Sequence, residues 1–229
     1  MATSAQSSAS DTAAAKANTG PARPPPPKLS ADDFRIYNRL AVLMDSYHNH
    51  LRETWNMLHT ACSTSSRPPG TSIRAFLMHG LHLCRALTTH HTIEEQHVFP
   101  SLAERMPIFK PNDTLVQQHE QIHAGLDKFE AYLSACLDGE QELRMDAMKA
   151  IMDSFAQVLW THLDLEVKML GAENMRQYWT KDEILAMNCI HQHWTKDSIH
   201  QHWTKDSIHQ YWTKDSIHQY WTKDSIHQY

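Results

Sequence analysis

The chain has 229 residues and a formal net charge of −5, with acidic and basic residues interspersed along it. This balance argues against a nucleic-acid-binding or polybasic membrane role, and no apolar run approaches the roughly 18 residues that a membrane span needs. The chain contains 18 histidines, an excess that is the first indication of metal binding. The N-terminus lacks the apolar stretch of a secretory signal, so we expect an intracellular, cytoplasmic protein.

Residues 1–29 are rich in Ala, Ser, Thr and Pro and include the run Pro24–Pro27. A segment of this composition cannot bury enough apolar surface to offset its ordering entropy, so we predict that this arm is disordered. A first helix is predicted to begin near Ser30, because this side chain can cap it while Asp33 lies three residues further on. Its apolar residues then recur in steps of three and four up to Leu58.

A second helix is predicted from a near-heptad apolar seam that runs from Ile73 to Val98, and Pro100 should bend or end it. A third helix should follow Asp113 and close at Asp138-Gly139. These two segments have the apolar spacing of a helix that buries one face.

The fourth seam is the most regular, with apolar and polar core positions from Met148 to Met169 in alternating steps of four and three. No segment shows the alternation typical of a strand. Four helices of about 22–30 residues with short links predict an all-α fold, an antiparallel up-down-up-down four-helix bundle spanning residues 30–188.

A repetitive tail occupies residues 189–229. A nine-residue unit begins at His191, occurs four times, and matches residues 176–184 at seven of nine positions. Thr180 and Glu183 of that earlier copy predict a capping box for a short helix, Lys181–Met187. A nine-residue period builds no continuous apolar stripe on a helix, so we interpret the tail as an appendage with little bearing on function.

Histidines and glutamates occur in pairs that are four residues apart. This spacing places both members of a pair on one helical face, and the pairs are His90 with Glu94, His91 with Glu95, His119 with His123, and His162 with Glu166. The seam of the second helix favours His91 over His90 and leaves the two glutamates undecided. The first helix offers His48 and His50 beside its apolar stripe.

Burying this many ionisable groups without partners would cost several kcal/mol each or force large pKa shifts. A cation removes that cost, because neutral imidazoles and carboxylates are metal ligands. One histidine of the first helix and one pair from each of the other three give seven ligands, which suits two metal ions bridged by the two glutamates. With oxygen and imidazole donors and no thiolate, iron is favoured, and manganese or zinc is the alternative.

At these residues the chain resembles the hemerythrin-like (HHE cation-binding) family. The resemblance covers about residues 33–170 and is strongest at His90-His91-x-x-Glu94-Glu95-x-x-x-Phe99-Pro100. It implies a set of iron ligands with three alternates: His48, His91, Glu95, His119, His123, His162 and Glu166, with His50, His90 and Glu94 as the alternates. The true hemerythrins place the last carboxylate five residues after its histidine, whereas here the separation is four, so the chain is nearer to the wider family than to the oxygen carriers.

The expected function is therefore that of a metal-binding protein with a di-iron centre, which binds dioxygen or stores or senses iron. Its expected partner is dioxygen, nitric oxide or peroxide rather than nucleic acid or membrane. The alternative is an enzyme that turns over peroxide or nitric oxide at the same site. Tyr47 is only a weak candidate for a general acid, so catalysis ranks second, and a metal-free helical interaction module ranks third.

Overall fold

The computed structural model describes residues 27–187, so the predicted disorder of residues 1–26 and the repeats of the predicted tail domain lie outside the described residues. Helices dominate this part of the chain, and no strand occurs in it, which confirms the all-helical class. Within the same range, none of the helices combines the length and the apolar character that crossing a lipid bilayer requires.

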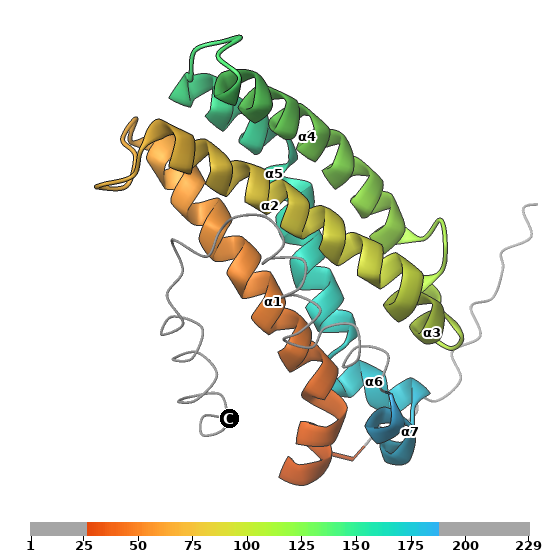
Figure 1. The fold of residues 1–229 in the computed structure, drawn as a ribbon. Coiled ribbons are helices and arrows are strands. Elements are labelled where there is room, and N and C mark those ends of the chain that lie inside the picture. The colour runs from red at the N-terminus through yellow and green to blue at the C-terminus, as the bar shows by residue number, and fades with distance from the viewer. Residues whose placement is uncertain (1–26, 188–229) are drawn as a thin grey trace, which may run out of the picture.

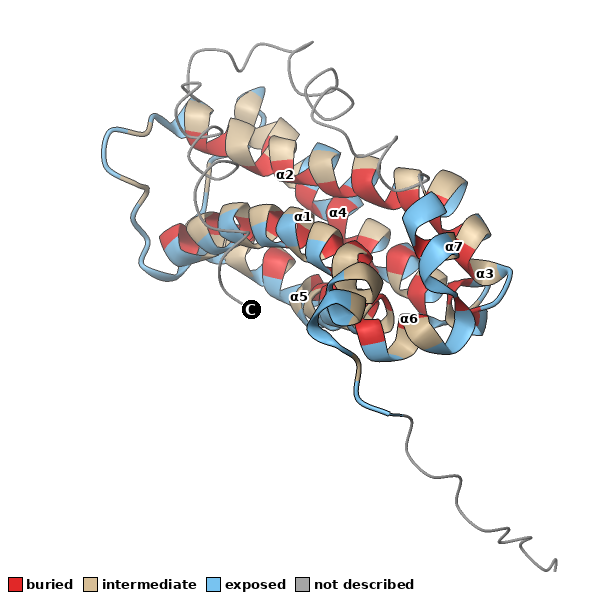
Figure 2. Ribbon diagram, turned by 90° about the horizontal axis from the view of Figure 1, so that it is seen from below, coloured by how far each residue is buried: buried red, intermediate tan, exposed pale blue. Residues whose placement is uncertain are grey.

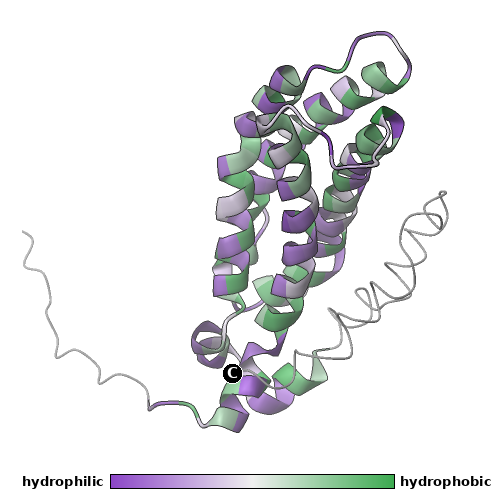
Figure 3. Cartoon of the chain, turned by 90° about the vertical axis from the view of Figure 1, so that its left-hand side faces the viewer, coloured by the Kyte–Doolittle hydropathy of each residue, from purple (hydrophilic) through white to green (hydrophobic). Residues whose placement is uncertain are grey.

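Four long helices form the body of the fold: α1 (Ala31–Ser63), α2 (Ile73–Ile93), α4 (Thr114–Leu137) and α5 (Met145–Met169). The pairs in contact are α1 with α2, α2 with α4, α4 with α5, and α5 with α1, so each long helix packs against two others (Figure 1). Buried residues lie on the faces that the helices turn toward one another (Figure 2), and hydrophobic and hydrophilic residues alternate along each helix (Figure 3). This ring of contacts is compatible with the predicted bundle.

The helix starts follow from local capping. The Ser30 side chain accepts a hydrogen bond from the backbone N–H of Asp33, which confirms the predicted start of α1. Ser72 caps α2 in the same way by accepting from Ala75, and the Asp113 carboxylate caps α4. These side chains satisfy backbone donors that the first turn of a helix leaves without partners.

The second helix does not run unbroken to Val98. After α2, residues Glu94–Val98 form a π-helical turn (η1), and Phe99–Ala103 form the short helix α3. The backbone N–H of Phe99 bonds to the carbonyl of Glu94, five residues back. Pro100 lacks an N–H, and its ring would clash with a carbonyl four residues earlier in a regular α-helix, so the wider turn accommodates it. The predicted bend at the proline therefore takes the form of a π turn just before it.

Two short helices, α6 (Ala172–Tyr178) and α7 (Lys181–Ala186), cover one end of the body and pack against α1 (Figure 1). The helix α3 and the turn η2 (Pro107–Phe109) lie at the same end. The capping box of Thr180 and Glu183 is present as predicted. Arg105 donates two hydrogen bonds to Glu183 and lies 4.3 Å from the ring centroid of Trp179. These contacts tie the two short helices to the end of α3.

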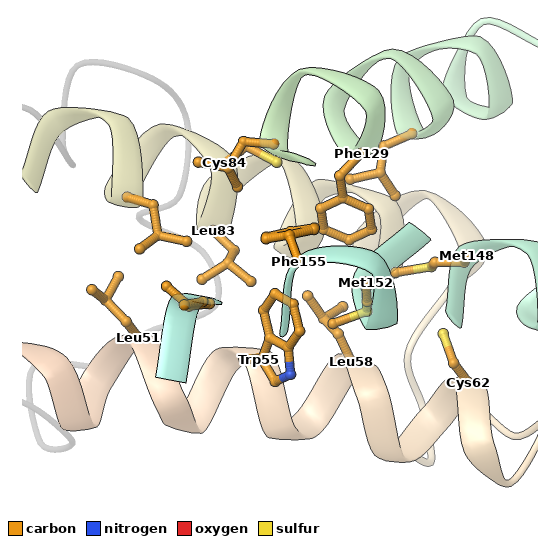
Figure 4. Packing of buried hydrophobic residues seen from close by; sticks show 14 of the residues in the cluster. Leu51, Trp55, Leu58, Cys62, Leu83, Cys84, Phe129, Met148, Met152 and Phe155 are labelled. Carbon is orange, nitrogen blue, oxygen red and sulfur yellow. The ribbon is translucent and has the colours of Figure 1, made fainter. Parts of the chain in front are cut away.

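The buried apolar residues form two clusters. The first lies among the four long helices and includes Trp55, Phe129 and Phe155, whose rings pack edge to face or tilted (Figure 4). The second includes Met44 and Trp179 and lies under α6 and α7. Along α1 and α4 the second cluster comes before the first, and along α2 and α5 the order is reversed. On every long helix the candidate ligands lie close to the boundary between the two clusters.

The packing of Gly125 in α4 generates a stability prediction. A Cβ atom at this position would lie 2.4–2.6 Å from Cβ, Cγ and Cδ1 of Phe155. Because these atoms are held close to the α5 backbone, Gly125→Ala should lower the free energy of unfolding by about 1–3 kcal/mol in urea denaturation. The matched control is Gly80→Ala, whose Cβ would meet the flexible end of Leu133 at 2.6 Å and should cost less. Equal losses in the two variants would contradict this reading of the packing.

Candidate metal centre

A layer of seven buried polar residues lies between the two apolar clusters, and every long helix contributes to it. The α1 helix provides one histidine, α2 two, and α4 one, while the π turn provides a glutamate and α5 a histidine and a glutamate. All seven are at most 6% exposed: His48, His90, His91, Glu94, His119, His162 and Glu166. Such a concentration of ionisable groups in a protein interior requires an electrostatic partner.

The seven side chains form two groups of four that share one residue. In each group the ligand atoms lie within 4.8 Å of one another. The histidine-rich group consists of His91, Glu94, His119 and His162, and the glutamate-rich group consists of His48, His90, Glu94 and Glu166. Each group has the size and the donor types to surround one cation.

Glu94 is the shared residue, and its two oxygens face different groups. Its Oε1 lies 2.9 Å from Nε2 of His90, and its Oε2 lies 3.3 Å from Nε2 of His119. A carboxylate in this position can bridge two cations. Glu166 belongs to the glutamate-rich group alone, although its Oε2 lies 3.9 Å from Nε2 of His162. The structure therefore offers one shared glutamate where the sequence predicted two bridging ones.

The imidazole nitrogens converge on each other as closely as on the carboxylates. Nε2 of His48 lies 3.0 Å from Nε2 of His90 and 3.3 Å from Oε2 of Glu166. In the other group, Nε2 of His119 lies 3.1 Å from Nε2 of His162. Nitrogen lone pairs directed at a common point are the arrangement that metal ligation needs.

Several buried atoms of the layer make no hydrogen bond within the chain, although imidazole rings approach them closely. They are both carboxylate oxygens of Glu94, both of Glu166, Nε2 of His91 and Nδ1 of His162. A buried polar atom without a partner costs roughly 1–3 kcal/mol. One cation within each group would give the carboxylate oxygens and the His91 nitrogen a partner, so the residues present fit a metal centre.

Outer contacts turn the Nε2 atoms of three histidines inward. Nδ1 of His48 donates to the carbonyl oxygen of Leu163 at 3.1 Å, and Nδ1 of His119 donates to Oε1 of Glu95 at 2.6 Å. Nδ1 of His91 lies 3.3 Å from Nε2 of His123. Since metal-ligating histidines use their second ring nitrogen in this way, these contacts orient the ligands and set their tautomers.

Burial keeps most of the imidazoles neutral. It lowers the pKa of His48 and of His91 well below the usual value, and it lowers the pKa of His162 to about 3. Burial acts on His119 in the same direction, but the nearby Glu94 carboxylate and the hydrogen bond to Glu95 outweigh this and raise its pKa. Neutral imidazole is the form that binds metal.

The two buried glutamates titrate in opposite directions. Burial alone would raise the pKa of Glu94, but His90 and His119 outweigh it and hold that pKa well below its usual value. Burial and the nearby Glu94 carboxylate both raise the pKa of Glu166 well above its usual value. The raised pKa of Glu166 favours its protonated form in the metal-free layer, and a cation bound by this carboxylate would displace that proton.

The structure brings together five of the seven ligands expected from sequence, together with two of the alternates, His90 and Glu94. Glu95 and His123 lie outside both groups, each one contact away from a ligand. His50 and the half-buried Tyr47 also lie outside, and burial raises the pKa of Tyr47 to about 12.

The packing of α2 and the π turn against the neighbouring helices decides between Glu94 and Glu95. Glu94 lies four residues after His90 and is fully buried, whereas Glu95, the next residue of the π turn, is exposed and contacts His119 of α4. The two adjacent histidines are not alternatives, because His90 joins one group and His91 the other. Both groups therefore take a ligand from α2, and the adjacent histidines at positions 90 and 91 are the sequence feature that indicates this.

Comparison with known proteins identifies the family. The model of the hemerythrin HHE cation binding domain matches residues 39–172, more than half of the chain, so the protein belongs to this family. The chain is also 27% identical, over 150 residues, to the dimeric xanthone biosynthesis cluster protein R11 of Cryptosporiopsis sp. (strain 8999). That match covers 63% of this chain and 56% of the relative, so the chain spans little more than half of the relative's length. No solved structure shows significant similarity to it.

Three buried histidines whose pKa is lowered, His48, His91 and His162, predict that acid destabilises the metal-free protein. The pKa of His162 is about 3 in the folded chain and 6.5 in the unfolded chain, so between these pH values the unfolded chain binds a proton that the folded chain does not bind. The stability this provides is present above pH 6.5 and is lost as the pH falls toward about 3, by up to about 1.4 kcal/mol per pH unit for each such group. His48 and His91 act in the same direction, while Glu166 and His119, whose pKa values are raised, act in the opposite one.

Urea unfolding in the presence of a chelator, at about pH 7.5, 6.5 and 5.5, measures this dependence. The free energy of unfolding should fall with acid, and His162→Gln should make the fall shallower because the glutamine does not titrate. The same pH dependence in the variant would show that His162 is not buried in neutral form.

Proposed function

We propose that the protein is a non-haem di-iron protein in which the histidine-rich and glutamate-rich groups each hold one iron ion and Glu94 bridges them. The single observation that carries the proposal is the sharing of Glu94 by two buried four-residue groups. We also propose that the four long helices form an antiparallel up-down-up-down bundle. The alternating order of the two apolar clusters along successive long helices supports that arrangement.

The donor set supports iron as the metal. Both groups offer imidazole nitrogens and carboxylate oxygens, and no cysteine of the described residues belongs to either group. Such mixed nitrogen and oxygen donors suit iron, with manganese or zinc as the alternatives. Cys62 and Cys84 belong instead to the first apolar cluster, where burial raises their pKa to about 11 and about 12, so they stay protonated.

We propose that the centre binds dioxygen, or that its occupancy serves to store or sense iron. When bound, the iron ions supply the coordination and redox chemistry that this role needs. The chain supplies four donors per ion, fewer than an octahedral ion accepts, which leaves room for a small ligand. The apolar clusters on both sides limit the access of water, and the ring of Phe99 stacks on His119 with centroids 5.4 Å apart.

The second candidate is a di-iron enzyme that acts on peroxide or nitric oxide at the same site. The similarity to a protein named for a xanthone biosynthesis cluster is the observation that favours it. Steady turnover of peroxide by iron-loaded protein, with the iron content unchanged afterwards, would decide for the enzyme. Stoichiometric binding of dioxygen without turnover would decide for the binding protein.

The shared glutamate generates the test of the metal centre. Iron-reconstituted protein should contain about two iron ions per chain, measured by elemental analysis. Glu94→Gln should lose most of the iron, because both ions lose a ligand while the side-chain volume is kept. Glu95→Gln, the matched control one residue along, should keep about two ions at saturating iron. Equal iron contents in the two variants would contradict the assignment of Glu94 as the bridge.

Removing the metal should lower stability, because a ligand that binds only the folded state stabilises it. At an iron concentration 100 times the dissociation constant the gain is about 2.7 kcal/mol. Thermal unfolding of iron-loaded and chelated protein measures this difference. A melting temperature and helical content that do not change on chelation would instead support the metal-free interaction module.

A further inference from the structure

The two groups differ in the outer contacts that orient three of their five histidines. In the glutamate-rich group, His48 is oriented by a backbone carbonyl, that of Leu163 within the last third of α5. In the histidine-rich group, His119 and His91 are oriented by the side chains of Glu95 and His123. A carbonyl inside a helix cannot move without local unfolding, whereas a side chain can rotate.

Both outer side chains of the histidine-rich group reach the surface. The Glu95 side chain is 43% exposed, and His123 is half-buried. They come from facing elements, the π turn and α4, which places them at the seam between α2 and α4. Burial and His119 lower the pKa of His123, while the Glu95 and Asp127 carboxylates oppose this, so all these groups lie within electrostatic reach of one another.

The two histidines held in this way are in direct contact with each other. The rings of His91 and His119 are stacked, with centroids 3.9 Å apart and planes 15° from parallel. One ring of the pair is hydrogen-bonded to Glu95 and the other contacts His123. Because water competes for hydrogen bonds at an exposed carboxylate, the orientation of both rings depends on contacts that open more easily than the His48–Leu163 bond.

We infer that the metal ion in the histidine-rich group exchanges with solvent faster than the ion in the glutamate-rich group, with Glu95 and His123 as the positioning residues that limit its release. The inference rests on the proposed function, since it requires an ion in each group. Release requires the ligand imidazoles to rotate away from the ion, so weaker outer contacts allow faster release. Loss of such contacts typically costs 10–100-fold in metal affinity.

The test measures iron release without any measurement of activity. Full-length protein loaded anaerobically with ferrous iron is mixed with an excess of a colour-forming ferrous chelator, and absorbance follows the iron that leaves. Two phases of about equal amplitude are expected, separated by about tenfold or more in rate. Glu95→Ala and His123→Ala should each accelerate the fast phase about tenfold and leave the slow phase unchanged. Gln96→Ala, an exposed neighbour on the same π turn, is the matched control and should change neither phase.

A second variant assigns the phases to the groups. His48→Ala, with helicity checked, should abolish the slow phase and retain the fast one. Loss of the fast phase instead, release of both ions at one rate in the wild type, or acceleration of the slow phase by Glu95→Ala would each overturn the inference. A wild-type protein that takes up no iron would contradict the proposed function itself, whereas two ions that leave at one rate would contradict this inference alone.

Discussion

The structure depends on one constraint, the burial of seven imidazoles and carboxylates in a single layer. Without cations these groups would destabilise the fold, because each loses its hydration and six of their buried atoms, including all four carboxylate oxygens, have no hydrogen-bond partner within the chain. Their mutual convergence on two points makes the layer suited to cations. The constraint also acts on the helices, since α1, α2, α4 and α5 must all bring a ligand to the same level. The apolar clusters on either side pack the helices at that level and exclude water from the layer.

A local irregularity of the backbone lies at the centre of this layer. Glu94, the residue common to both groups, is the first residue of the π turn that precedes Pro100. The turn begins at Glu94 itself, four residues after His90, so the wider geometry affects mainly the residues that follow Glu94. Phe99 and Leu102 are thereby buried in the second cluster, next to the layer. The π turn therefore allows Pro100 to follow closely after the candidate ligand Glu94 without breaking the helix between them.

The outer contacts make the two groups unlike, although they share a glutamate. One group is oriented by a helix carbonyl in the interior, and the other by side chains at the α2–α4 seam. The end of the layer near the second cluster is covered by α6 and α7, most of which lies beyond the residues matched by the family model. Trp179 and Ile184 of this cover are buried, and Arg105 holds it in place by a hydrogen bond to Glu183. The family core and its extension thus enclose the centre together.

The sequence by itself determined the helical class and the helix starts at Ser30 and Thr180, because capping and apolar periodicity are local properties of the chain. It also determined the membership in the HHE family, because the histidine and glutamate motif is a property of the sequence. It also singled out the region of the centre, because histidines and glutamates four residues apart must share a helical face. It did not decide between Glu94 and Glu95, and it treated His90 and His91 as alternatives. Only the tertiary structure separated them, because which face of α2 meets α1 and which meets α4 depends on helix packing. The same packing left Glu95 and His123 one contact outside the ligands.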